Sequence, residues 1–174
     1  MELKKEIIEK AKRLVNSTEF SKLILNSKIN EGNFTPAQKA PEKSKDAFKF
    51  HTDEEVGFDE RLCREFVRFC LEHLKIEDAG ELTVVISADK EMFKTFAFYS
   101  MDTKLAAVYG VNRHILDVFR SLAHELVHYQ QDLNDKITPE QVGDNNDGVN
   151  IENEANSVAG VIMRKYGREH RDLY

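Results

Sequence analysis

Two histidines stand four residues apart in residues 121–128, and a glutamate directly follows the first of them, which gives the pattern H-E-x-x-H. On an α-helix, residues four apart differ by about 40° of rotation and one turn of rise, so His124 and His128 would project from one side. Zinc accepts imidazole ligands in a tetrahedral arrangement, and a catalytic zinc lowers the pKa of a bound water to about 7. Glu125 could then accept the proton of that water. The spacing therefore indicates a zinc-hydrolase site with metal ligands His124 and His128 and catalytic Glu125.

The segment that carries this pattern has the periodicity of an amphipathic helix. Its apolar residues recur at helical spacing and would form one side, whereas its polar residues form a separate stripe. The apolar side consists of Ile115, Val118, Phe119, Leu122, Leu126 and Tyr129, and the polar stripe of Asp117, Ser121, His124, His128 and Gln131. Both predicted ligands thus lie on the stripe that would not be used for packing.

A zinc site of this kind needs a third protein ligand from elsewhere in the chain. Residues 151–166 predict a second helix, whose buried side would hold Ile151, Ala155, Val158, Ile162 and Tyr166. Glu152 and Glu154 flank that apolar stripe at similar angles on either side. Helical periodicity alone does not choose between them.

With both segments in view, the sequence resembles a gluzincin, the class of zinc peptidases in which a glutamate from a downstream helix completes H-E-x-x-H. More narrowly, residues 119–128 are similar to the active-site helix of the ImmA/IrrE-type metallopeptidase domain, and residues 152–159 to its glutamate helix. The resemblance implies Glu154, directly before an alanine, as the third ligand, and Zn²⁺ as the cofactor. It also implies an α+β, zincin-like fold, in which a small mixed or antiparallel sheet packs on the two ligand helices. In that family the implied substrates are transcriptional repressors.

Composition restricts the partners of the chain. A net charge of -6 over 174 residues argues against general affinity for nucleic acid, which needs a concentrated basic surface. No stretch approaches the roughly 20 apolar residues of a membrane span, and the charged opening is unlike a signal peptide. We therefore expect a cytoplasmic protein with a protein or peptide substrate and neither a nucleic-acid nor a membrane partner. The sequence leaves the oligomeric state open.

The pattern along the chain predicts an N-terminal helical segment with a long loop over residues 1–57 and a zincin-like domain over residues 58–174. Residues 26–57 combine glycine, proline and lysine with few aliphatic residues, so we expect a loop, which could also serve as a lid or inhibitory arm. In the domain, Asp59 begins a predicted helix that ends near Leu74. Strands are predicted at 82–86, 95–99 and 105–111. The last of them is the candidate for a free edge that binds an extended peptide, because it precedes the metal helix.

Several further residues have a possible chemical role beside a more ordinary one. A donor that stabilises the oxyanion could come from Tyr109, Tyr129, Tyr166 or His170, which the sequence does not rank. The oxygen-rich residues 144–148 lack the spacing of an EF-hand, so a turn is favoured over a calcium site. Cys63 and Cys70 would be separated by about 10 Å along a helix, too far for a disulfide, which predicts core packing.

The competing hypothesis is a binding module of the same fold, in which zinc is structural or absent and the cleft holds a partner without cutting it. Glu125 argues against that hypothesis, because a purely structural zinc site has no need of a general base.

Overall fold

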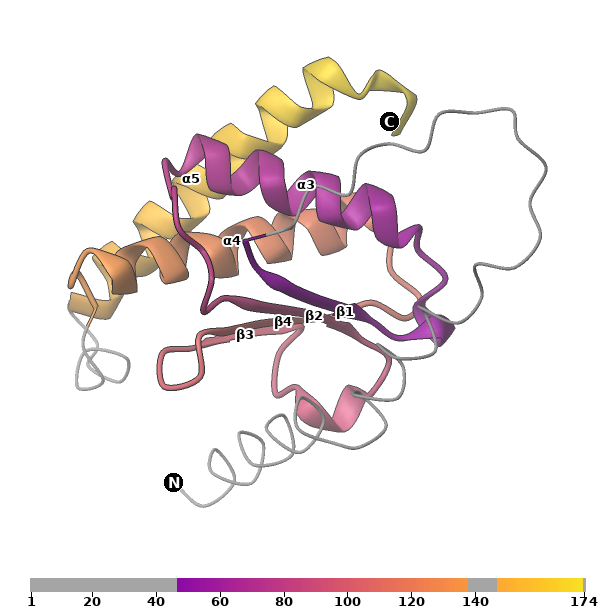
Figure 1. Ribbon diagram of the computed structural model, residues 1–174, viewed down its shortest axis with the longest axis horizontal. Helices are drawn as coiled ribbons and strands as arrows, with labels where there is room; N and C mark the ends of the chain where they lie inside the picture. The colour runs from indigo at the N-terminus through magenta and orange to yellow at the C-terminus, as the bar shows by residue number, and fades with distance from the viewer. Residues whose placement is uncertain (1–46, 138–146, 174) are drawn as a thin grey trace. The chain divides into compact units, whose positions relative to one another are not determined.

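Four short strands form one mixed sheet in the computed structural model, which describes residues 47–137 and 147–173 (Figure 1). The strand order is β1-β2-β4-β3; β1, β2 and β4 run parallel and β3 is antiparallel to β4. The register pairs Val84 with Ala106 and Phe98 with Ala107. The bounds are Lys49–Thr52 for β1, Thr83–Ser87 for β2, Ala97–Ser100 for β3 and Leu105–Tyr109 for β4.

Three α-helices of the described residues lie on the same side of this sheet in Figure 1: α3 (Glu60–His73), α4 (Ile115–Leu133) and α5 (Asp147–Glu169). Local sequence signals explain where two of them begin. The Asp59 carboxylate accepts hydrogen bonds from the backbone N–H groups of Arg61 and Leu62, and His114 caps α4 in the same way. The predicted α+β class is therefore confirmed, as are the helix that follows Asp59 and the helix that carries H-E-x-x-H.

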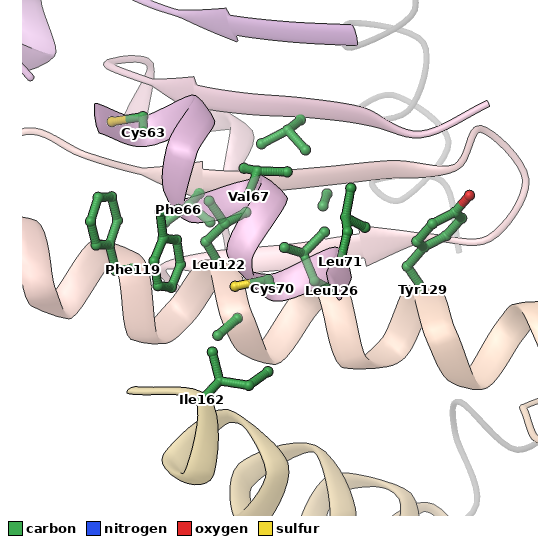
Figure 2. Packing of buried hydrophobic residues seen from close by; sticks show 14 of the residues in the cluster. Cys63, Phe66, Val67, Cys70, Leu71, Phe119, Leu122, Leu126, Tyr129 and Ile162 are labelled. Atoms are coloured by element: carbon green, nitrogen blue, oxygen red, sulfur yellow. The ribbon is translucent and has the colours of Figure 1, made fainter. Parts of the chain in front are cut away.

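Aromatic side chains join the three helices over the sheet. The Phe66 ring of α3 stacks on Phe119 of α4 at a centroid distance of 4.1 Å, and Tyr166 of α5 meets Phe66 edge-on at 4.9 Å. Figure 2 shows Phe66 and Phe119 together with Ile162 of α5. This packing holds α4 against α3 and α5 while α4 also contacts β3 and β4, which fixes how α4 is rotated and hence where its polar side faces.

The two cysteines belong to this core. Cys63 and Cys70 are free thiols, and both are completely buried. Burial raises the pKa of the Cys63 thiol to about 12, so the reactive thiolate is disfavoured. The prediction that both pack in the core is confirmed.

One strand lies where the sequence predicts loop. β1 falls inside residues 26–57 and pairs with β2 over its whole length, with Phe48 and Phe50 buried. The compact unit that contains the sheet begins at Ala47, so it includes β1 as well as the predicted domain. The predicted N-terminal helical segment, and the part of the predicted loop before residue 47, lie outside the described residues.

The expectation of a free edge at residues 105–111 is wrong. β4 lies between β2 and β3, and both of its backbone edges are occupied by pairing. The turn after Ser100 folds β3 back onto β4, with Lys104 in the left-handed conformation (φ 49°). Among the strands of the described residues, β1 and β3 are therefore the outer ones.

Candidate metal centre

The two histidines of the H-E-x-x-H pattern point their outer ring nitrogens at the same place. The Nε2 atoms of His124 and His128 are 3.0 Å apart, and the ring centroids are separated by 4.7 Å. His128 is buried and His124 is half-buried. The helix therefore arranges the pair as the sequence predicts, on one side of α4.

A carboxylate from α5 completes this group. Glu152 places Oε2 at 3.1 Å from His124 Nε2 and Oε1 at 3.3 Å from His128 Nε2. Ligand atoms of a tetrahedral zinc site, each about 2.0–2.1 Å from the metal, lie about 3.4 Å from one another. The distance between the two nitrogens, and the distance from each nitrogen to the carboxylate oxygen that faces it, are close to that spacing. Two neutral imidazoles and one carboxylate are also a donor set that zinc accepts, so the residues fit the ion.

Glu154, the third ligand that the resemblance implies, lies outside this group in the structure. Its carboxylate accepts hydrogen bonds from Lys136 Nζ at 2.9 Å and from Gln131 Nε2 at 3.0 Å. These contacts hold the pKa of Glu154 below its usual value, with Lys136 making the largest contribution. Residues 152 and 154 differ by about 200° of helical rotation, so only one of them can face the histidines.

The side of α5 that faces the histidines also carries Asn156, one turn after Glu152. Asn156 is hydrogen-bonded to His124. Between these residues and Glu154 lies the buried stripe of α5, which contains Ala155 and Ala159. The direction of this stripe relative to α4 decides which glutamate reaches the site.

The environment of His124 favours the form that binds a metal. Burial, and then the charge of His128, lower the pKa of His124, although Glu152 and Asn156 act in the opposite direction. The net effect disfavours the imidazolium, which has no lone pair to offer a cation. His124 is therefore ready to coordinate near neutral pH.

Glu125 is a buried carboxyl group beside the first histidine, with only 7% of its surface exposed. Burial raises the pKa of Glu125 to about 8, and the charge of Glu152 adds to the effect. A general base works best when its pKa is near the working pH, and a cation bound nearby would favour its charged form. A carboxyl group in this position can exchange a proton near neutral pH.

Gln131 connects the two ligand helices behind the metal group. It is 1% exposed, and its Oε1 lies 2.8 Å from His128 Nδ1. Its Nε2 donates to the Ile151 carbonyl at 3.1 Å and to Glu154. The sequence places Gln131 on the polar stripe of α4 but gives it no role; its position three residues after His128 is the only signal.

Comparisons with known proteins do not assign this site. No model of a protein family, no curated protein and no solved structure matches the chain. The centre is defined by its own chemistry: two imidazole nitrogens and a carboxylate converge, a buried carboxyl group adjoins them, and a buried amide lies behind them.

Most of the proposed oxyanion donors are placed elsewhere. Tyr166 follows Glu152 by about 21 Å along α5, and its ring packs in the core against Phe66. His170 stacks on Tyr166 at 4.0 Å, so it is equally distant. Tyr129 is 1% exposed and packs beside Tyr99. Tyr109 lies in contact with Phe93 and beneath the ammonium of Lys90. Of the turn predicted at residues 144–148, residues 144–146 lie outside the described residues, and α5 begins at Asp147.

No helix within residues 47–137 and 147–173 is long and apolar enough to cross a membrane.

Proposed function

We propose that this protein is a zinc-dependent peptidase in which His124, His128 and Glu152 bind the metal and Glu125 is the general base. The observation that carries the proposal is the convergence of the three donor groups, 3.0 to 3.3 Å apart, beside a buried carboxyl group. The resemblance to gluzincins supports the roles of His124, His128 and Glu125 and a third ligand from the second helix; Glu152 rather than Glu154 takes that place in this proposal because it lies beside the histidines. We also propose that the fold is zincin-like, since a mixed sheet packed on the active-site helix is compatible with that fold.

In the proposed hydrolysis, Glu125 transfers the proton and the other three side chains hold the metal. Bound zinc supplies Lewis acidity, which acidifies water and polarises a carbonyl group. Glu125 accepts a proton from the attacking water and later donates it to the leaving amine, so it ends the cycle in its initial state. His124, His128 and Glu152 hold the metal, and the burial around Glu125 keeps its carboxyl group from being fully solvated. We propose a protein or peptide as the substrate.

A Glu125→Gln variant tests this mechanism because glutamine keeps the size of the side chain and removes its basicity. We expect the variant to bind zinc as the wild type does and to cleave peptides at least 100-fold more slowly, which is the contribution typical of a general base. Cleavage is measured by mass spectrometry on a mixed peptide library with zinc-loaded protein. Glu65→Gln, on the exposed side of α3, is the matched control and should retain full activity.

Equal rates for wild type and Glu125→Gln would show that the assigned mechanism is wrong. A folded, zinc-loaded wild type that cleaves no peptide of the library would instead favour the binding-module hypothesis.

A further inference from the structure

The amide of Gln131 has a fixed orientation because of the groups around it. Its Nε2 faces the Ile151 carbonyl at 3.1 Å and a Glu154 carboxylate oxygen at 3.0 Å. A carbonyl and a carboxylate accept hydrogen bonds and donate none, so the nitrogen end of the amide must face them. The ion pair between Lys136 and Glu154 keeps that carboxylate an acceptor. The remaining oxygen, Oε1, therefore faces His128.

This orientation determines which nitrogen of His128 carries a proton. Gln131 Oε1 can only accept a hydrogen bond, so His128 Nδ1, 2.8 Å away, must be the donor. The neutral form of His128 has one N–H, so when that proton is on Nδ1 the Nε2 atom carries a free lone pair. That nitrogen is the one that faces His124 Nε2 and Glu152.

We propose that Gln131 is a positioning residue of the metal centre: it holds His128 with its proton on Nδ1, so that Nε2 is free to bind a metal, and it ties the first ligand helix to the start of the second. The inference rests on the proposed function for the identity of the bound ion. The link through the Ile151 carbonyl fixes the backbone directly before Glu152. Glu154, which the sequence suggests as a ligand, acts here as the partner that orients the amide.

The neighbouring amide on α4 shows what a purely structural glutamine would do. Gln130 donates its side-chain N–H to the Leu74 carbonyl at the end of α3, away from the metal group. Its loss would remove one link between helices without touching His128. Gln130→Leu is therefore the matched control for Gln131→Leu.

The first measurement follows the imidazole nitrogens of the metal-free protein by long-range ¹H–¹⁵N NMR at mildly alkaline pH. We expect His128 to be protonated on Nδ1 in the wild type and in Gln130→Leu, and to lose this preference in Gln131→Leu. A wild type with the proton on Nε2 would overturn the proposal.

The second measurement is the zinc affinity of the same proteins, determined by competition with a chromophoric chelator. Removal of a group that orients a metal ligand typically weakens binding by about 10–100-fold, which we expect for Gln131→Leu. Gln130→Leu should bind zinc as the wild type does. Unchanged affinity in a folded Gln131→Leu variant would overturn the role in metal binding. If the wild type binds no zinc, the proposed function fails, whereas the Nδ1–H form lost in Gln131→Leu would still support the orientation of His128 by Gln131.

Discussion

Three carboxyl groups show how neighbouring residues set the chemistry of one side-chain type. Burial raises the pKa of Glu125 to about 8, whereas the Lys136 ammonium lowers that of Glu154. Near neutral pH the first can exchange a proton, and the second remains an acceptor. Their roles as a base and as an orienting partner follow from these surroundings.

Asp53 is the third carboxyl group, at the end of β1. It accepts hydrogen bonds from Ser87 Oγ at 2.8 Å and from the Ala88 N–H at 2.7 Å, and it contacts His51 at 2.9 Å. Its pKa falls from the usual 3.8 to about 2, and the hydrogen bond with His51 is the largest cause. This single carboxylate therefore joins the ends of two parallel strands.

A lowered pKa makes the folded state more stable above pH 3.8, and this stabilisation is lost as the pH falls through about 2. We expect the free energy of unfolding of the wild type to fall more steeply between these values than that of Asp53→Asn. The side chain is partly exposed, so the difference should be about 1 kcal/mol after solvent screening. Urea unfolding at several acidic pH values measures it, with the exposed Asp102→Asn as the control. If the free energy of unfolding changed with pH equally in wild type and Asp53→Asn, the lowered pKa of Asp53 would be contradicted.

At the scale of elements, a glycine lets β4 pass close to its neighbours. A Cβ atom on Gly110 would lie 2.6 Å from Val56 Cγ1 and 2.9 Å from Ile86 Cγ2. The backbone N–H of Gly110 donates a hydrogen bond to the Ser87 carbonyl. Both neighbours are buried, so they have little room to move. The close packing of η1 (Glu54–Val56) and β2 against the end of β4 depends on the missing side chain.

Gly110→Ala should therefore reduce the free energy of unfolding by about 1–3 kcal/mol, the usual cost of overpacking. Gly160→Ala is a control with the opposite expected sign. It lies inside α5, where the nearest atom, Arg164 NH1 at 3.4 Å, belongs to a flexible side chain. Alanine there should stabilise the protein by about 0.5–1 kcal/mol. Urea unfolding measures the free energy of unfolding of both variants. An unchanged value for Gly110→Ala would count against the close packing around Gly110.

Elements with strong local signals are those that the sequence predicts. The Asp59 cap and the apolar periodicity predict α3, and a run of β-branched residues predicts β2. β1 has only four residues and owes its order to pairing with β2, a contact made across 34 residues of chain between Lys49 and Thr83. The position of β4 between β2 and β3 depends on the order of the strands in the sheet, which the periodicity of the sequence does not predict.

The same distinction holds for the candidate site. His124, Glu125 and His128 share one helix, so their relative placement follows from helical geometry. The choice between Glu152 and Glu154 depends on how α5 is rotated against α4, which is set by packing of residues such as Ala155 and Ile162. Gln131 was visible only as one more polar residue, because its partners come from the distant α5.

In the domain as a whole, α5 is attached to its neighbours at two separate places along its length. Toward the C-terminal half of α5, Tyr166 packs on Phe66 and Phe119; near its start, Glu152 meets the two histidines. Because the metal group has ligands from both helices, a bound ion would add a link between α4 and α5. A ligand that binds only the folded state raises its stability by mass action.

The zinc content of purified protein tests the central claim most directly. Wild type, Glu152→Ala and Glu154→Ala are exposed equally to limiting zinc and analysed by mass spectrometry, with circular dichroism to confirm that each is folded. We expect about one zinc per chain in the wild type, loss of most of it in Glu152→Ala, and substantial retention in Glu154→Ala. A wild type without zinc after reconstitution, or loss in Glu154→Ala with retention in Glu152→Ala, would contradict the account.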